Sequence, residues 1–265
     1  MPGFTKKLTL LFVISIVVVA LSYQFLLKPQ YAVPILMYHN IENGENESLY
    51  VGKRNFSQQM AYIKKYGYNV ISLDELVAGI KNKRNFKHNT LVITFDDGYL
   101  GNYTNAYPIL KSYDFPATIF LISNYIGKDK EFLKWPHIQE MLKNSKITFG
   151  GHTRNNIYLP DAKDKGILEN EISGCRKDIQ ARLNTRVDYF CYPAGGFSKD
   201  IKKIAEQSGY KGACTTNRGF NESGIDVYAL RRIKIKDSDF GKNPLSFWFK
   251  LSGYYNLFRK AKNPY

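Results

Sequence analysis

The sequence predicts an α/β fold in which parallel strands joined by helices close into a barrel, preceded by one N-terminal transmembrane helix. Short apolar runs alternate with amphipathic stretches along most of the 265 residues, and this alternation is typical of parallel strands with crossover helices. Seven or eight such units can be counted, which favours a closed barrel over an open sheet. Near the N-terminus, an uncharged apolar run has the length of a membrane span.

The apolar run covers residues 8–27 and follows Lys6 and Lys7. A buried helix would show a polar face, and this run shows almost none. Small residues at 20 and 22 leave a cleaved signal peptide as an alternative, but the run exceeds a usual signal core and favours a retained signal anchor. Because lysines favour the cytoplasmic side, we expect residues 1–28 to be a cytoplasmic stub and single-pass anchor in the plasma membrane, with the rest extracytoplasmic.

The expected elements follow the anchor in order. Strands are expected where short runs are rich in β-branched and aromatic residues, at 33–38, 70–72, 91–95, 117–122, 147–150, 189–192, 211–215 and 231–235. Helices are expected where the apolar period is near 3.6, at 57–66, 73–80, 103–113, 135–144, 163–183 and 199–208. These elements make one domain over 29–239. The aromatic and basic tail at 240–265 packs on the barrel or lies on the membrane surface.

Composition narrows the function classes. The net charge of +15 fits a surface near an anionic membrane better than a specific anionic ligand. No helix-turn-helix, zinc-finger or RNA-binding signature is found, so nucleic acid is not expected as a partner. Cys175, Cys191 and Cys214 show no CxxC spacing, which argues against a cysteine zinc site. Buried thiols are the simplest interpretation, with a bridge between the last two left open.

Reactive residue types follow several of the expected strands. Asp96 and Asp97 follow the third run, His152 follows the fifth, and His39 follows the first. Each has an ordinary structural explanation by itself, such as an Asp-Gly turn. In an α/β barrel, however, the carboxyl ends of the strands meet at one mouth, so we expect a metal, a base and an acid in one pocket. Asn156 is a weaker ligand nearby. The reaction class indicated is metal-assisted hydrolysis.

Four segments carry a resemblance to a known family. They are TFDDG at 94–98, His-Thr at 152–153, Tyr-Pro-Ala-Gly at 192–195 and Leu-Met-Tyr-His at 36–39. Over 33–235 the chain resembles the polysaccharide deacetylases of the NodB-homology type, carbohydrate esterase family four. The early position of Leu-Met-Tyr-His is similar to the circularly permuted branch, which includes the poly-N-acetylglucosamine deacetylases. The family fold, a distorted (β/α)7 barrel, agrees with the strand count.

The resemblance implies a role for each matching residue. Asp96 corresponds to the general base and His39 to the general acid. The resemblance implies a divalent metal, Zn²⁺ first with Co²⁺, Ni²⁺ or Mn²⁺ as alternatives, at Asp97, His152 and Asn156. The wall of the acetyl pocket, where a backbone N–H holds the oxyanion, corresponds to the loop of Tyr192, Pro193 and Gly195.

Two positions depart from the family pattern. Asn156 stands where the second histidine of the metal site is expected, and Cys191 stands where many relatives carry an arginine that orients the base. Arg231 or Arg232 could replace that arginine from a later strand.

The expected activity is metal-dependent hydrolysis of N-acetyl groups from a cell-envelope or exported polysaccharide that contains N-acetylglucosamine, with release of acetate. Two alternatives stay open. One is a non-catalytic carbohydrate-binding relative, and the other is an O-acetyl glycan esterase. The expected partners are the N-acetylated polysaccharide and the membrane.

Overall fold

The computed structural model describes residues 2–23, 25, 31–46, 48–144, 146–216, 226–241 and 244–255. The strands are β1 (Ile35–Tyr38), β2 (Asn69–Val70), β3 (Thr90–Phe95), β4 (Ala117–Leu121), β5 (Ile147–Gly151), β6 (Tyr189–Cys191), β7 (Gly212–Thr215), β8 (Leu230–Arg231) and β9 (Ile233–Lys234). The α-helices are α1 (Pro2–Ser22), α2 (Lys53–Lys65), α3 (Leu73–Lys81), α4 (Tyr107–Ser112), α5 (Trp135–Asn144), α6 (Lys165–Glu169), α7 (Cys175–Leu183), α8 (Lys199–Gln207), α9 (Ser238–Gly241) and α10 (Pro244–Leu251).

The strands form one parallel sheet in the order β8-β7-β6-β5-β4-β3-β1-β9, with β2 beside β3. β8 and β9 lie on either side of Arg232, and they pair with β7 and β1 respectively. The segment Leu230–Lys234 therefore joins the two ends of the sheet and closes the ring. The parallel barrel-like α/β fold is confirmed. The resemblance implied seven strands, whereas the described residues hold nine short ones.

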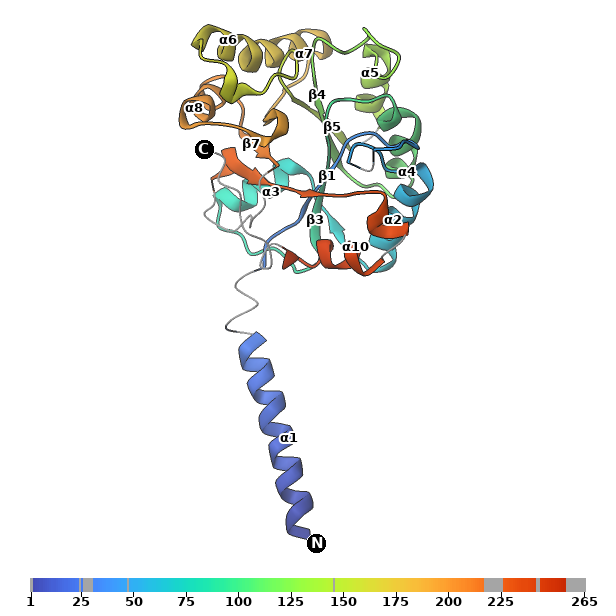
Figure 1. Ribbon diagram of the computed structural model, residues 1–265, viewed down its shortest axis with the longest axis vertical. Helices are drawn as coiled ribbons and strands as arrows, with labels where there is room; N and C mark the ends of the chain where they lie inside the picture. The colour runs from blue at the N-terminus through green and yellow to red at the C-terminus, as the bar shows by residue number, and fades with distance from the viewer. Residues whose placement is uncertain are drawn as a thin grey trace.

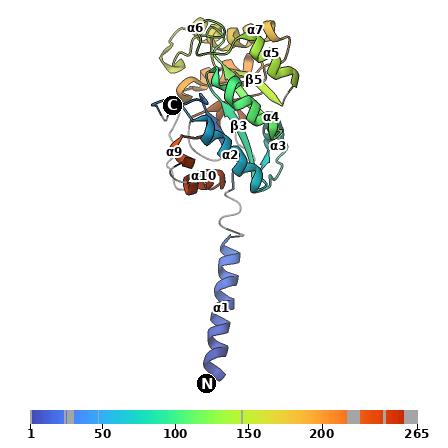
Figure 2. The same ribbon diagram turned by 90° about the vertical axis from the view of Figure 1, so that its right-hand side faces the viewer.

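Helices cover the outside of the ring, as Figures 1 and 2 show from two directions. Between the strands and α2, aromatic side chains pack against one another. Tyr38 lies 5.3 Å from Phe56 and 5.4 Å from Phe95, measured between ring centroids, and all three are fully buried. The hydroxyl of Thr94 also donates to the carbonyl of Leu36 at 2.7 Å. These contacts hold β1 and β3 in register, which positions the residues that follow them.

The N-terminal helix, α1, does not pack on the barrel. α1 extends away from the domain in both views (Figures 1 and 2), and the apolar side chains from Leu8 to Leu21 are largely exposed. No helix among the described residues is both long and apolar enough to cross a membrane. The expected anchor stays a prediction, and residues 24 and 26–30 lie outside the described residues.

The described part of the C-terminal tail packs on the barrel. α10 buries Phe247 and Leu251 and leaves Leu245 and Trp248 exposed. The remainder of the expected tail, at 256–265, lies outside the described residues. As a result, α9 and α10 become part of the wall around the mouth of the barrel.

Candidate active site

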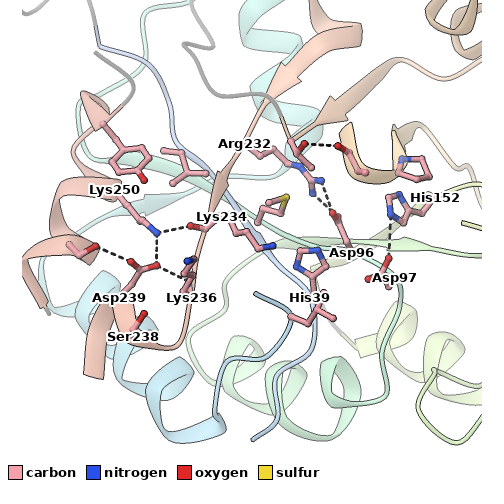
Figure 3. A pocket seen from close by; sticks show the side chains of 18 of the residues that line it. His39, Asp96, Asp97, His152, Arg232, Lys234, Lys236, Ser238, Asp239 and Lys250 are labelled. Carbon is pink, nitrogen blue, oxygen red and sulfur yellow. Dashed lines mark hydrogen bonds and ion pairs between the residues drawn. The ribbon is translucent and has the colours of Figure 1, made fainter. Parts of the chain in front are cut away.

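Four predicted residues meet at the mouth of the barrel. His39, Asp96, Asp97 and His152 line one cavity of about 1010 Å³, shown in Figure 3. The register explains why. Tyr38 pairs with Phe95 across β1 and β3, so the next residues, His39 and Asp96, are placed side by side at the carboxyl ends of adjacent strands.

Asp96 forms a buried ion pair with Arg232. The two guanidinium Nη atoms donate to the two carboxylate oxygens, each at 2.6 Å, and the two residues are 2% and 1% exposed. Arg232 also donates to the Thr94 hydroxyl at 3.1 Å and to the Thr215 carbonyl at 3.3 Å. Burial raises the pKa of the Asp96 carboxyl, but the charge and hydrogen bonds of Arg232 outweigh it and hold that pKa below its ordinary value. Asp96 is thus an ionised, oriented carboxylate.

Of the two arginines that could orient the base, the structure places Arg232 against it. Arg231 pairs with Thr215 across β7 and β8, and its side chain is partly exposed. Cys191 leaves room for this arrangement. Its sulfur lies 3.7 Å from both oxygens of Asp96 and accepts an N–H from Arg232 at 2.9 Å. Burial raises the pKa of the Cys191 thiol, which keeps it protonated.

Asp97 and His152 face each other across the same cavity. The Nε2 atom of His152 lies 3.3 Å from Oδ1 of Asp97, and both side chains are almost fully buried. The other ring nitrogen, Nδ1, lies 2.7 Å from the carbonyl oxygen of Cys191. Because a carbonyl only accepts, Nδ1 carries a hydrogen in this bond. In a neutral imidazole Nε2 is then an acceptor facing a second acceptor, so a proton or a cation must lie between them.

A divalent metal fits this pair. Two ligands about 2.0 Å from a tetrahedral zinc ion are about 3.3 Å apart, which matches the separation of Nε2 and Oδ1. A hydrogen bond from Nδ1 to a backbone carbonyl also commonly orients a metal-binding histidine. Asp97 and His152 could therefore hold a metal at the mouth of the barrel.

A second cluster competes for this role. One ligand atom from each of Asp96, His152 and Cys191 lies within 4.8 Å of the others. Both oxygens of Asp96 and the sulfur of Cys191, however, accept hydrogen bonds from Arg232. A cation at that point would lie against the guanidinium charge, so the geometry favours Asp97 as the carboxylate ligand.

Asn156, the third predicted ligand, lines the same cavity but is exposed. Its backbone N–H donates to the hydroxyl oxygen of Thr153 at 2.9 Å. Within the part of the chain that the structure describes, its amide forms no hydrogen bond with Asp97 or His152. The structure thus places Asn156 at the rim and leaves its ligand role a prediction.

The backbone around the mouth is strained. Positive φ angles occur at Asp97 (70°), Thr153 (62°), Asn156 (56°) and Ala194 (51°). Such conformations cost about 1–3 kcal/mol each in non-glycine residues and tend to occur at functional sites. Gly98 follows with φ 74°, and a Cβ there would lie 2.8 Å from a side-chain carbon of Leu121. The two successive left-handed residues turn the chain sharply after β3, so that Asp96 and Asp97 point to different partners.

His39 directly follows β1 and lines the cavity. Burial lowers the pKa of its imidazole, Lys234 and Arg232 lower it further, and Asp96 and Asp97 act in the opposite direction; the result is a pKa below the ordinary value. Figure 3 shows the ring beside Asp96. An imidazolium with a lowered pKa is a stronger proton donor.

The loop after β6 forms another wall. Pro193 and Ala194 line the cavity, whereas Tyr192 and Gly195 lie behind them. Tyr192 is fully buried, and its hydroxyl donates to the carbonyl of Tyr228 at 3.1 Å. The predicted substrate loop therefore presents Pro193 to the cavity, while its neighbours support it.

Comparison with known proteins identifies the family. The family described as polysaccharide deacetylase matches residues 83–213. YxkH of Bacillus subtilis, assigned to the polysaccharide deacetylases, is 32% identical over 202 residues, which cover 76% of this chain and 71% of YxkH. The chain belongs to the polysaccharide deacetylase family. The family predicted from the motifs is thus confirmed, and the deacetylase is a hydrolase that acts on the amide bonds of N-acetyl groups in polysaccharides.

Two further likenesses support this assignment. The deacetylase is 27% identical to the poly-beta-1,6-N-acetyl-D-glucosamine N-deacetylase of Staphylococcus epidermidis over 201 residues, 72% of this chain and 69% of that one. Its fold is similar to that of the Streptococcus pyogenes deacetylase PplD, solved in complex with acetate, with a TM-score of 0.74 and 29% identity over 82% of this chain and 97% of PplD.

Sequence reasoning missed one wall of the deacetylase cavity. β9 and the α9–α10 region contribute Lys234, Lys236, Asp239 and Lys250 to it. The buried ammonium of Lys250 donates to the carboxylate of Asp239 and, at 2.7 Å, to the carbonyl of Lys234. The alternation of basic and apolar residues from Arg232 to Lys236 was the available signal, because it places the basic ones on one face of a strand.

Proposed function

We propose that the deacetylase removes N-acetyl groups, in a metal-dependent reaction, from an N-acetylglucosamine-containing polysaccharide that is exported or belongs to the cell envelope. The observation that carries the proposal is the approach of His152 Nε2 to Asp97 Oδ1 at 3.3 Å, beside a carboxylate that Arg232 keeps ionised. A metal site, a base and an imidazole in one cavity are the parts that amide hydrolysis requires.

Asp97 and His152 would hold the metal, zinc first, with Asn156 as the third predicted ligand. A divalent cation supplies a Lewis acid that polarises a carbonyl oxygen and makes water easier to deprotonate. Cobalt, nickel or manganese would serve in the same way. The hydrogen bond from Nδ1 of His152 to the Cys191 carbonyl keeps Nε2 directed at the metal position.

Asp96 would act as the general base and take a proton from the attacking water. Arg232 orients it through both oxygens, so the carboxylate does not need to reorganise during the reaction. His39 would donate a proton to the departing sugar nitrogen, which an amide needs because its amine is a poor leaving group.

The oxyanion would be stabilised at the loop after β6. The N–H of Tyr192 donates to the Cys214 carbonyl and that of Gly195 to the Tyr192 carbonyl, and Pro193 has no N–H. Ala194 lines the cavity and is the loop residue that we propose as the donor. Such a donor contributes about 3 kcal/mol to catalysis.

The named activities of similar proteins support the substrate class. Poly-beta-1,6-N-acetyl-D-glucosamine is the substrate named for the staphylococcal relatives. Extending that class to this deacetylase, with residues 1–28 as an anchor and the barrel outside the plasma membrane, is part of the proposal.

Acetate release from β-1,6-linked N-acetylglucosamine oligomers, with and without a chelator, tests the proposal. We expect release that the chelator abolishes and added zinc restores. Asp96→Asn should abolish release while zinc binding, measured by calorimetry, persists. Asp200→Asn on α8 changes an exposed carboxylate away from the cavity and should leave release unchanged.

Three outcomes would contradict parts of the proposal. Near-normal turnover by Asp96→Asn would refute the base assignment. No acetate from any N-acetylated glycan with any of the four metals would refute catalysis and favour a carbohydrate-binding role. Faster release from an O-acetylated xylan than from N-acetylated oligomers would identify an esterase.

A further inference from the structure

A row of basic side chains runs along the last strand of the barrel. Arg232, Lys234 and Lys236 alternate with Ile233 and Ile235. Alternate residues of an extended strand share a face, and both isoleucines are buried, at 4% and 2% exposure. The three basic residues line the cavity, and Figure 3 shows them in order along the strand.

The row passes from the floor of the cavity to its rim. Arg232 is fully buried, Lys234 is partly exposed and Lys236 is exposed. β9 pairs with β1 in a register that matches Lys234 with Met37, two residues before His39. The middle of the row is therefore beside the proposed reaction centre, and its outer end lies at the exposed rim of the cavity.

The three carboxylates that line the cavity are engaged by groups other than the two lysine ammoniums. Asp96 is paired with Arg232, Asp97 faces His152, and Asp239 accepts from Lys250. Lys236 meets Asp239 only through its backbone N–H, at 2.7 Å. Within the described residues, neither ammonium forms an ion pair or a hydrogen bond.

Holding an unpaired cation partly out of water is unfavourable. Burial lowers the pKa of Lys234 and the charge of Lys236 lowers it further; the charges of Asp96 and Asp97 act in the opposite direction without reversing the shift. A fold that needed only solubility would place Lys234 on an open surface, as it does Lys236. Their position indicates a binding role that an anion completes.

We propose that Lys234 and Lys236 bind a carboxylate or phosphate group on the sugar unit next to the one that loses its acetyl group, so that the preferred substrate is an anionic N-acetylated glycan. This inference rests on the proposed function. The cavity of about 1010 Å³ is at the upper end of the size range of ligand sites and has room for more than the acetylated unit.

Three N-acetylated oligosaccharides test the proposal. One is a neutral N-acetylglucosamine oligomer, one alternates N-acetylglucosamine with glucuronate, and one carries phosphodiesters. kcat/KM for acetate release is measured for the native chain, Lys234→Gln, Lys236→Gln and the double variant. Lys203→Gln, an exposed lysine of α8 outside the cavity, is the matched control.

We expect the native enzyme to favour an anionic oligosaccharide over the neutral one. The double variant should lower the ratio of anionic to neutral kcat/KM about tenfold, as the loss of two partly exposed charge pairs implies. Lys203→Gln should leave the ratio unchanged. A larger effect on the carboxylate or on the phosphodiester substrate identifies which anion is bound.

An equal ratio in the native enzyme and the double variant would overturn the inference, while acetate release from the neutral oligomer would leave the proposed function standing. If no oligosaccharide releases acetate, the proposed function fails and equilibrium dialysis decides the inference. Weaker binding of the anionic oligosaccharides to the double variant by about tenfold would then support the subsite, and unchanged binding would overturn it.

Discussion

Replacing Arg232 by methionine removes the two hydrogen bonds that Asp96 receives from the guanidinium, each at 2.6 Å. The carboxylate is 2% exposed, so the substitution leaves a buried charge without its main partner. Breaking a buried pair from one side costs about 3–5 kcal/mol, against about 0–1 kcal/mol for a surface pair. We expect the free energy of unfolding of Arg232→Met to fall by about 3–5 kcal/mol at pH 7.

Urea denaturation followed by tryptophan fluorescence measures this loss. Arg231→Met is the matched control, because the neighbouring arginine is partly exposed and its loss should cost less than about 1 kcal/mol. The double variant Arg232→Met/Asp96→Asn should recover part of the loss, since it no longer buries an unpaired charge.

Equal losses for Arg232→Met and Arg231→Met would refute the reasoning. So would a double variant less stable than Arg232→Met, because it would show that the buried carboxylate is not the source of the cost. Either result would remove the basis for treating Arg232 as the residue that orients the base.

Three further predictions concern the metal, the pH dependence of stability and the N-terminus. Asn156→His should tighten zinc binding at least about tenfold by calorimetry, and an unchanged affinity would show that residue 156 does not face the metal. The hydroxyl of Tyr189 donates to Asp74 and is the main cause of the lowered pKa of that carboxyl. A carboxyl whose pKa is lowered by folding stabilises the fold at pH values above its ordinary pKa of 3.8. This stabilisation is lost as pH falls through the lowered pKa. Tyr189→Phe should therefore lower Tm at pH 7 by more than at pH values below that range, and a gap independent of pH would contradict this account. Deleting residues 1–28 should move the protein from the membrane to the soluble fraction of cells, and an unchanged distribution would argue against the anchor.

Most of the barrel follows from local patterns. Each expected strand has a counterpart within a few residues. Buried strands of a parallel sheet are continuous apolar runs, and polar segments separate these runs in the sequence. The helices expected at 103–113 and 163–183 are present, but each contains a wide turn, at 102–106 and at 170–174. In the second turn Glu171 accepts backbone N–H groups from Arg154 and Asn155, each at 2.9 Å. The periodicity of the sequence does not predict a contact between Glu171 and the distant loop after β5.

The site was predictable where a residue directly follows a strand. His39, Asp96 and His152 follow strands that meet at one mouth, so topology alone brings them together. Which of Arg231 and Arg232 faces inward depends on the register of β8 with Thr215, and alternation by itself leaves both choices open. Asn156 lies several residues into a loop with a positive φ of 56°, and its direction depends on backbone angles that residue types only weakly determine.

The pairing of β1 with β9 has a consequence for biosynthesis. The first strand of the barrel is complete early in translation, yet its outer neighbour is the segment Leu230–Lys234, near the other end of the chain. Contacts between segments so far apart in sequence form late and slowly. A nascent or prematurely terminated chain would present β1 as an open edge and Asp96 without its guanidinium. Ring closure by the last strand is thus the folding step that protects the sheet from association and, at the same moment, produces a competent enzyme.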